Sequence, residues 1–270
     1  MPELPEVETS RRGISPHIIN QKITNIALRH HQLRWPIPDN LPLLLKNKTL
    51  LSIDRRAKYL LLRFENGTLL IHLGMSGSLR ICEIGSVAQK HDHVDFQFQH
   101  CLLRYTDPRR FGAILWLGLT PEESTLLSIL GPEPLSDEFT TEMLYEQAKK
   151  RKVPVKQLIM DQKIVTGVGN IYATEALFNA GISPIRAANN ISLKRYQLLV
   201  DAIKKILEEA IKQGGTTLKD FVGGDGKPGY FQQTLHVYGK TGLLCPNCQT
   251  PLSSVKIAAR NSVYCQQCQH

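Results

Sequence analysis

Four cysteines near the end of the chain have a spacing that is typical of a metal site. Cys245 and Cys248 form one Cys-x-x-Cys pair, and Cys265 and Cys268 form a second pair after sixteen intervening residues. Two such pairs place four thiolates on two tight turns, and four thiolates complete a tetrahedral Zn²⁺ site with no open position. A pair of disulfides is the alternative, but disulfides are rare in the reducing cytosol. The spacing therefore predicts one structural zinc ion that folds this segment and does no chemistry.

The first residues of the chain are suited to chemistry by an amine. The chain begins MPELPEVETSRRG, and an initiator methionine before proline is normally removed, which would expose a secondary amine on Pro2. The pKa of an α-amino group lies roughly 2.5 units below that of a lysine, so much more of it is free base at neutral pH. After attack on a sugar aldehyde carbon, a secondary amine forms an iminium ion that draws electrons from neighbouring C–O bonds. Glu3, the next residue, can donate the proton that such a reaction needs.

A second interpretation of the same residues is structural. Pro5 suits the first turn of a helix, Glu6 and Glu8 complement the positive end of its dipole, and Gly13 can terminate it. The stretch is then a well-capped helix without a chemical role. In either case the residues before the helix lie at its N-terminus, where an anion is attracted.

The composition favours a polyanionic partner. Lys and Arg total 33 against 24 Asp and Glu, which gives a formal net charge of +9 and a pI near 9.3. A basic protein neutralises phosphates and releases their counterions, so nucleic acid suits this balance. Residues 239–270 contain no Asp or Glu at all. No apolar run reaches the ~20 residues of a membrane span and no signal-peptide pattern opens the chain, so we expect a cytoplasmic protein with no membrane partner.

Hydrophobic patterning changes from a strand period to a helix period along the chain. The first half contains six short runs that are branched, aromatic or partly alternating, as in antiparallel strands. These expected strands cover residues 22–30, 49–54, 59–64, 68–74, 93–99 and 112–118. The second half has apolar residues at helical spacing. The expected helices cover residues 121–130, 140–150, 170–181 and 192–215.

Turn and capping residues mark several boundaries between these elements. Asn66-Gly67 predicts a tight β-hairpin turn, because such turns need residues that tolerate positive φ. Ser192 can cap the last helix, and Gly214-Gly215 can end it. The sequence GPEPLSDE at 131–138 lies where the period changes and predicts a hinge.

A series of sequence blocks resembles the formamidopyrimidine-DNA glycosylase family, and the match extends from residue 1 to the last cysteine. The blocks read MPELPEVETSRRGI, RRAKYLLL, HLGMSGSLRI, KHDHVD, RYTDPRRFGA, LGPEPLSDEF, GVGNIYATEALF, GGTTLKDF and DGKPGYF, followed by the four-cysteine segment. The resemblance implies an α+β protein. Residues 1–131 would form an antiparallel β-sandwich, 132–138 a hinge, 139–238 a helical domain with a helix–two-turn–helix element, and 239–270 a zinc ribbon.

The resemblance also implies a bifunctional repair activity on duplex DNA. Such an enzyme flips an oxidised purine, 8-oxoguanine or a formamidopyrimidine, out of the duplex, because C1′ cannot be reached within the base stack. It then displaces the base and nicks the strand by β- and δ-elimination, and abasic sites are a second substrate. By position, Pro2 is the nucleophile and Glu3 the acid/base that protonates the sugar. Lys58 in RRAKYLLL is the proton donor in β-elimination, and Arg260 acts in δ-elimination.

Four residues are matched to contacts with the DNA backbone. Asn170 in GVGNIY is expected to hold phosphates that flank the lesion, and His91, Arg110 and Arg151 are the other matched contacts. Some relatives carry Lys where this chain has Arg151, which preserves the charge of a phosphate contact.

Three residues resemble the wedge that fills the gap left by a flipped base. They are Met75, Arg110 and Phe111. Without the resemblance, Met75 and Phe111 would be interpreted as core residues. The pocket for the flipped base is matched to Glu6, Lys219 and Tyr230.

Two other functions stay open at this point. An endonuclease VIII-like glycosylase shares the terminal Pro-Glu chemistry but prefers oxidised pyrimidines, and a zinc-dependent DNA-binding protein would have no catalysis. Leu4, the PRRFG block and the GGDGKPGYF segment favour the purine enzyme, and the set of Pro2, Glu3 and Lys58 favours catalysis. The ribbon reads AARNSVYC where many relatives carry Gly or Gln before the arginine, so its loop departs from the family pattern. We expect a monomer that acts at the bacterial nucleoid.

Overall fold

The computed structural model describes residues 2–215 and 234–270. The chain divides into two compact units: unit 1 takes residues 1–128 and 213–232, and unit 2 takes 129–212 and 233–270. Lys219 and Tyr230 lie outside the described residues. The hinge at 132–138 and the boundaries of the other three expected segments stay predictions.

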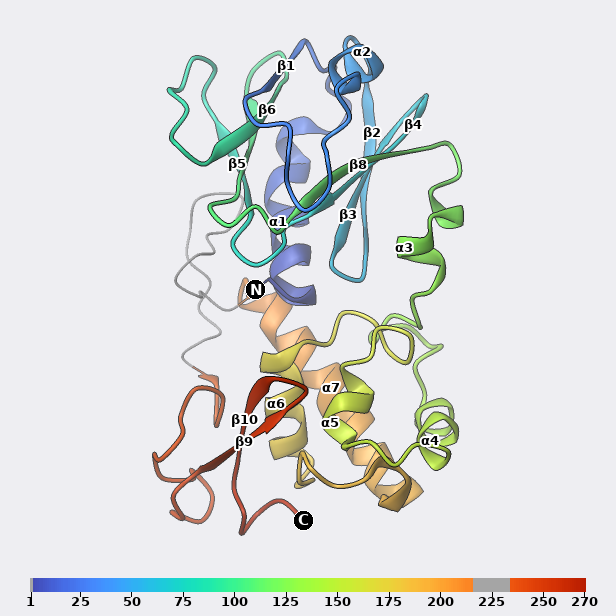
Figure 1. Cartoon of the computed structure of the whole chain (residues 1–270), viewed down its shortest axis with the longest axis vertical. Helices are drawn as coiled ribbons and strands as arrows, with labels where there is room; N and C mark the ends of the chain where they lie inside the picture. Colours follow the sequence, from blue (N-terminus) through green and yellow to red (C-terminus); the bar gives the residue numbers. More distant parts are fainter. Residues whose placement is uncertain (1, 216–233) are drawn as a thin grey trace. The chain divides into compact units, whose positions relative to one another are not determined.

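Unit 1 contains two antiparallel four-stranded sheets, with strand orders β2-β3-β4-β8 and β1-β6-β7-β5 (Figure 1). The first sheet consists of β2 (Leu50–Arg56), β3 (Tyr59–Phe64), β4 (Gly67–His72) and β8 (Ala113–Gly118). The second consists of β1 (Asn25–Leu28), β6 (Asp92–Gln97), β7 (Leu102–Thr106) and β5 (Ser78–Cys82). The antiparallel sheets expected from the sequence are confirmed.

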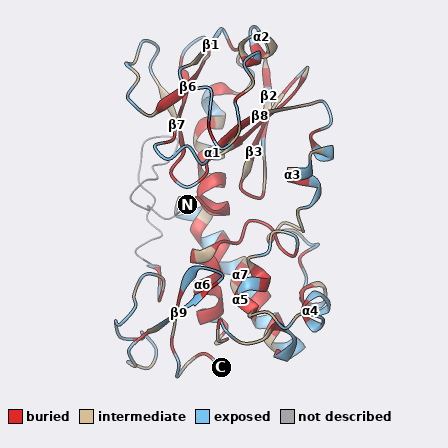
Figure 2. Ribbon diagram, in the orientation of Figure 1, coloured by how far each residue is buried: buried red, intermediate tan, exposed pale blue. Residues whose placement is uncertain are grey.

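One hydrophobic core joins the two sheets of unit 1. Leu62 from β3 and Ile71 from β4 belong to the same cluster as Phe96 from β6 and Leu103 from β7. Helix α1 (Leu4–Ile18) contributes Ile14 to this cluster and packs against strands of both sheets. Figure 2 shows the buried residues of unit 1 along α1 and the strands, with exposed residues mainly in the connecting loops.

Several local expectations for unit 1 need correction. Gly13 does not end α1, since the helix continues to Ile18. The hairpin at Asn66-Gly67 is present, but Gly67 pairs with Phe64, so the turn residues are 65 and 66. The helix expected at 121–130 is instead a 3-10 turn, η1 (Pro121–Glu123), and the short α3 (Thr125–Ser128), separated by an extended Ser124. Helix α2 (Leu41–Leu45) and strands β5 and β7 were not among the expected elements.

Unit 2 is helical and ends in a β-hairpin. Its helices are α4 (Thr141–Lys149), α5 (Val155–Ile159), α6 (Asn170–Asn179) and α7 (Leu193–Lys212), with a 3-10 turn η2 (Ala188–Asn190). Ser192 Oγ accepts a hydrogen bond from the backbone of Arg195 at 3.4 Å, and left-handed Gly214 and Gly215 follow α7, as the capping residues predicted.

The end of unit 2 forms the ribbon. Strands β9 (Ser253–Ile257) and β10 (Arg260–Tyr264) pair antiparallel. Leu252 and Val263 of the ribbon pack in one cluster with Phe178 of α6. The ribbon is therefore fixed to α6 by a shared apolar core.

No helix within residues 2–215 and 234–270 has both the length and the apolar composition to cross a membrane.

Candidate functional site

Residues 2 and 3 are held at the start of helix α1. Pro2 is buried, and Glu3 is the N-cap residue and only 2% exposed. The backbone N–H of Glu3 donates to Glu6 Oε2 at 2.8 Å, one half of a reciprocal capping box. Because the capping box fixes the backbone at residue 3, it anchors the chain immediately after residue 2 at the helix N-terminus. The helical and the chemical interpretations of this stretch are thus compatible.

Glu6 serves the helix in this structure. Its carboxylate is fully buried, caps the backbone of Glu3, and lies beside Gly215, where an added Cβ would meet Glu6 Oε1 at 3.1 Å. Gly215 immediately precedes the segment that contains the other two expected pocket residues. The role of Glu6 in a base pocket stays a prediction.

Glu8 is bound by three arginines rather than by the helix dipole alone. Its carboxylate oxygens accept from Arg11 at 2.8 and 3.0 Å, from Arg12 at 2.8 Å and from Arg55 of β2 at 3.3 Å. Burial by itself raises the pKa of Glu8, but the hydrogen bonds from Arg11 and Arg12 and the charges of Arg11 and Arg55 together lower it to about 2. The pairing with Arg55 connects α1 to the first sheet.

Lys58 lies in the two-residue turn between β2 and β3, because Arg56 pairs with Tyr59. The other turn residue, Ala57, has a positive φ of 55°. Lys58 is only 8% exposed, which is unusual for a lysine in a turn. Its ammonium group is close enough to affect His72: burial first, and then the charges of Lys58 and Arg34, lower the pKa of His72 to about 4.

His72 is consequently neutral at physiological pH. Its Nδ1 accepts a hydrogen bond from the backbone of Gly74 at 3.1 Å, which assigns the ring proton to Nε2. Lys58 is thus a charged side chain that is largely buried beside the neutral ring of His72. This placement suits an acid that transfers a proton within a protected site.

The two apolar residues matched to the wedge are surface residues. Met75 is 37% exposed and Phe111 is 48% exposed, so the alternative that they belong to the core is wrong. The guanidinium group of Arg109 lies over the ring of Phe111, 4.8 Å from its centroid. Both residues follow directly from buried strands, β4 in one case and β7 in the other, through short loops.

Arg110 occupies the left-handed region, with φ of 56°. Its guanidinium Nη1 donates to Nε2 of His30 at 2.8 Å, so His30 is neutral in this arrangement. Burial and the charge of Arg110 lower the pKa of His30. His91, the remaining matched contact of unit 1, lies just before β6 and its carbonyl accepts from the backbone of Asp107 at 3.1 Å.

In unit 2, Asn170 is the first residue of α6. Gly169 is its N-cap, and Gly167 has a positive φ of 80°, so the glycines bring the chain into the helix through a tight turn. The side-chain oxygen of Asn170 accepts from Lys156 Nζ at 2.7 Å, which orients its NH₂ group as a donor. Donors at a helix N-terminus bind phosphate oxygens.

Lys156 is a residue that the sequence reasoning missed. Its side chain is 1% exposed, and its ammonium group also donates to Thr174 Oγ1 at 2.8 Å and to Ser262 Oγ of the ribbon at 2.7 Å. A single lysine thus connects α5, α6 and β10. The sequence carries no signal for this, since an isolated lysine between apolar residues is most often solvated.

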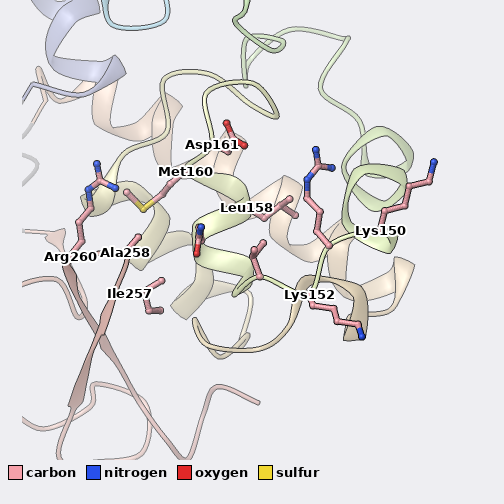
Figure 3. A pocket seen from close by; sticks show the side chains of 11 residues that line it. Lys150, Lys152, Leu158, Met160, Asp161, Ile257, Ala258 and Arg260 are labelled. Atoms are coloured by element: carbon pink, nitrogen blue, oxygen red, sulfur yellow. The ribbon is translucent and has the colours of Figure 1, made fainter.

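Arg151 and Arg260 line one cavity of about 550 Å³ in unit 2 (Figure 3). Lys150 and Lys152 add positive charge to it, and Asp161 is the acidic residue among its lining residues. Figure 3 shows Arg260 on the ribbon strand, with Lys150 and Lys152 on the side of α4 and α5. Four of its eleven lining residues are cations and one is an acid, and this excess of positive charge suits an anion such as a phosphate.

Arg260 follows a strained turn. Ala258 and Ala259 form the two-residue connection between β9 and β10, and both have positive φ, of 46° and 62°. A primed turn of this kind normally uses Asn-Gly. The departure from the family pattern noted in AARNSVYC is therefore accommodated by two alanines in left-handed conformations, and Arg260 starts the following strand.

The four ribbon cysteines fit a zinc ion. Their sulfur atoms lie within 4.8 Å of one another, and the Cys245–Cys268 and Cys248–Cys265 Sγ pairs are 3.9 and 3.4 Å apart. A tetrahedral Zn²⁺ with Zn–S bonds near 2.3 Å requires sulfur atoms about 3.8 Å apart. Cys245 and Cys265 are buried against the ribbon core. The ribbon binds one structural zinc ion, as the spacing predicted.

The structure thus combines packed antiparallel sheets with a lysine buried at a hairpin turn, a helical unit with an amide side chain at a helix N-terminus, and a zinc ribbon. Three family profiles match the chain. The formamidopyrimidine-DNA glycosylase N-terminal domain matches residues 1–114, the formamidopyrimidine-DNA glycosylase H2TH domain matches 130–222, and the zinc finger found in FPG and IleRS matches 242–270.

Full-length relatives agree with these profiles. Formamidopyrimidine-DNA glycosylase of Psychromonas ingrahamii is 74% identical over 269 residues, and that of Hahella chejuensis is 56% identical over 270 residues, each alignment covering 100% of both chains. The chain belongs to the formamidopyrimidine-DNA glycosylase family.

Solved structures share the fold. A variant of the Lactococcus lactis enzyme in complex with Fapy-dG-containing DNA is 34% identical with a TM-score of 0.94, covering 100% of both chains. The MutM (FPG) protein of Thermus thermophilus is 36% identical with a TM-score of 0.88, covering 99% of this chain and 98% of that one.

Proposed function

We propose that this glycosylase excises oxidised purines, 8-oxoguanine and formamidopyrimidines, from duplex DNA and cleaves the strand at the resulting abasic site. The observation that carries the proposal is the locked start of α1, where buried Pro2 precedes the N-cap Glu3. Family membership supports the reaction class, and a complex of the Lactococcus lactis enzyme with abasic DNA extends it to abasic substrates.

The Pro2 amine is the nucleophile of the proposed reaction. Its nitrogen lone pair attacks C1′, the bond from C1′ to the base breaks, and the base leaves with the bonding electrons and takes up the proton that the attacking amine loses. Opening of the sugar ring requires protonation of its oxygen, and Glu3 supplies this proton. The product is an iminium ion between the Pro2 nitrogen and C1′, which cannot neutralise itself by losing an N–H proton.

Strand cleavage then follows from the electron-withdrawing iminium ion. Loss of the C2′ proton expels the 3′ phosphate, and Lys58 supplies a proton in this β-elimination. Loss of a further sugar proton expels the 5′ phosphate, and Arg260 assists this δ-elimination. The buried position of Lys58 and the basic cavity around Arg260 support these roles.

Four residues hold the DNA backbone: Asn170, Arg151, His91 and Arg110. Three residues fill the gap left by the flipped base: Met75, Arg110 and Phe111. The oriented NH₂ group of Asn170 and the exposure of Met75 and Phe111 support this division. Phosphate contacts position the strand without reading sequence. Arg151→Gln should weaken binding to damaged and undamaged duplex equally and lower the slope of log K against log salt by about 0.9.

We also propose that the protein acts as a monomer in the bacterial cytoplasm. Light scattering at micromolar concentration, with and without DNA, measures the mass directly. A dimeric mass in both conditions would contradict this.

Borohydride trapping tests the nucleophile. The reductant should link the protein covalently to lesion-containing duplex through its N-terminal peptide, and mass spectrometry of the free protein should show Met1 removed. Pro2→Gly should weaken trapping, because it replaces the secondary amine with a primary one. A cross-link that maps to Lys58 would contradict the assignment.

Lesion choice is tested with paired duplexes that carry 8-oxoguanine or an oxidised pyrimidine in the same sequence. Single-turnover excision should favour the purine. Glu3→Gln should bind the purine duplex normally but excise the base about 10²-fold more slowly or worse, as loss of general acid–base catalysis predicts. Faster excision of the pyrimidine would assign the protein to the endonuclease VIII-like alternative.

A further inference from the structure

Asp107 is a fully buried carboxylate between the two loops that carry the wedge residues. It follows β7 directly and starts the loop that contains Arg110 and Phe111. The other loop follows β4 and contains Met75. A buried carboxylate is costly unless its oxygens are hydrogen-bonded, so its partners indicate what it stabilises.

The carboxylate of Asp107 accepts hydrogen bonds from both loops. Oδ1 accepts from Ser76 Oγ at 2.9 Å and from the backbone N–H of Arg109 at 3.2 Å. Oδ2 accepts from the backbone N–H of Gly112 at 2.9 Å and from the hydroxyl of Tyr105 at 3.2 Å. Burial, and then the charge of Asp107, raise the pKa of Tyr105 well above its ordinary value, so this hydroxyl remains a donor.

Three of the four side-chain and backbone groups that donate to the Asp107 carboxylate lie next to a residue matched to DNA contact, and one of them, Arg109, precedes Arg110. Ser76 follows Met75, and Gly112 follows Phe111. The backbone of Asp107 adds two direct contacts, because its carbonyl accepts from Arg110 N at 3.2 Å and its N–H donates to the carbonyl of His91 at 3.1 Å.

The two loops also pack backbone against backbone. Gly74 has a positive φ of 65°, and a Cβ at this position would collide with the backbone of Phe111 and Gly112. A Cβ on Gly112 would collide with the hydroxyl of Tyr105 and the carbonyl of His72. The loops therefore have little freedom to move apart, and Asp107 is the charged group at their junction.

We propose that Asp107 is a positioning residue for base flipping, which holds Met75, Arg110 and Phe111 in one rigid arrangement for insertion into the duplex. This inference rests on the wedge role given to those three residues under the proposed function. Asp107 does not touch DNA in this proposal. It acts through Ser76 and the backbone of Arg109 and Gly112.

Asp107→Asn tests the inference, because asparagine keeps the shape of the aspartate side chain but replaces one of its two acceptor oxygens with an NH₂ group. Whichever oxygen is replaced, the NH₂ group cannot accept the hydrogen bond from the backbone N–H of Arg109 or of Gly112 that the oxygen accepted. Single-turnover excision of the damaged base should fall about 10- to 100-fold, the scale of a misplaced positioning group. Cleavage of a preformed abasic site needs no base to be flipped, so it should stay within about threefold of wild type. The fluorescence of a 2-aminopurine beside the lesion, which reports unstacking, should rise more slowly than with wild type.

Asp95→Asn is the matched control for lost stability. Asp95 is another buried carboxylate, on β6, and its partners Arg104 and Arg29 lie outside the two loops. This variant should lower both activities together, in proportion to the folded fraction. Ser76→Ala, which removes one of the bonds to Asp107, should show the same selective defect as Asp107→Asn in weaker form, even if Asp107→Asn folds poorly.

Failure of the inference differs from failure of the proposed function. If Met75→Ala and Phe111→Ala excise the base at the wild-type rate, the wedge itself is refuted. If those two variants are slow but Asp107→Asn and Ser76→Ala lose excision and abasic cleavage equally, as Asp95→Asn does, the wedge stands and the positioning role of Asp107 is refuted.

Discussion

The ammonium group of Lys156 donates a 2.7 Å hydrogen bond to the side-chain oxygen of Asn170, and a second bond of the same length to Ser262 of the ribbon. The residue expected to hold phosphate and the strand that begins with Arg260 are thus connected through one buried lysine. Because the oxygen of Asn170 accepts from Lys156, its NH₂ group is the donor side, and this group also donates to the carbonyl of Asn261 of the ribbon at 3.3 Å.

Lys156→Met should therefore impair both stability and DNA binding. Methionine keeps the length of the side chain but leaves Asn170 Oδ1, Thr174 Oγ1 and Ser262 Oγ without this donor. We expect the free energy of unfolding to fall by about 1–3 kcal/mol, the cost of leaving buried polar groups unpaired. Denaturant unfolding and a DNA-binding isotherm measure the two effects. Lys163→Met, at an exposed lysine in the same unit, is the control, and an equal effect in both variants would contradict the role of Lys156.

The stability of unit 1 should depend on pH through Glu8. Its pKa is lowered in the folded protein from 4.5 to about 2, so its contribution to stability is complete above about pH 4.5 and is lost as the pH falls toward 2. Wild type should lose stability across this window more steeply than Glu8→Gln, which cannot titrate. Unfolding free energies measured from pH 7 to pH 2 give both slopes. Glu65→Gln, at an exposed hairpin turn, should keep the wild-type slope.

Removal of zinc should unfold the ribbon and leave unit 1 folded. Zn–thiolate bonds supply the folding free energy of such small modules. Chelation or Cys248→Ser should therefore abolish DNA binding, while the unfolding transition of unit 1 persists in calorimetry. Elemental analysis provides the direct measurement, and a protein that folds fully and binds DNA without tightly bound metal would refute this expectation.

The ribbon turn should become more stable when Ala258 and Ala259 are replaced by Asn and Gly. A left-handed conformation costs an L-residue such as alanine about 1–2 kcal/mol, and Asn-Gly is the preferred pair for primed turns. The double variant should release zinc to a chelator more slowly than wild type. Replacing Ala258 and Ala259 with valines should have the opposite effect. Unchanged release rates in both variants would indicate that the turn is not strained.

The sequence predicted elements where the pattern depends on local chemistry. The cysteine spacing, the glycines after α7 and the strand runs in β3 and β4 are of this kind, since each depends on neighbours in the chain. Strand β7 was missed because it contains Arg104, which reads as a surface residue. In the structure Arg104 is buried, and its guanidinium group donates a 2.8 Å hydrogen bond to Asp95 on the neighbouring strand β6.

In the candidate site, too, residues defined by their neighbours in the sequence were predicted, and residues defined by distant partners were not. The sequence predicts Pro2 and Glu3 as candidates from their chain position, and it predicts the cysteine cluster, which the structure confirms, from its spacing. Lys156 and Asp107 were missed, because their partners lie far away in sequence: Ser262 is 106 residues from Lys156, and Ser76 is 31 residues from Asp107. Met75 and Phe111 read alone resemble core residues, and their exposure is determined by the loops that carry them.

The junction at Asp107 has a consequence for engineering lesion preference. Two of its bonds are made to backbone amides, those of Arg109 and Gly112, and backbone amides are retained whichever side chain is present. The side chains at positions 110 and 111 can therefore be exchanged without removing these bonds. A library randomised at these two positions on an intact Asp107 should contain mostly folded proteins, in which selection can act on recognition of the opposite base rather than on survival of the fold.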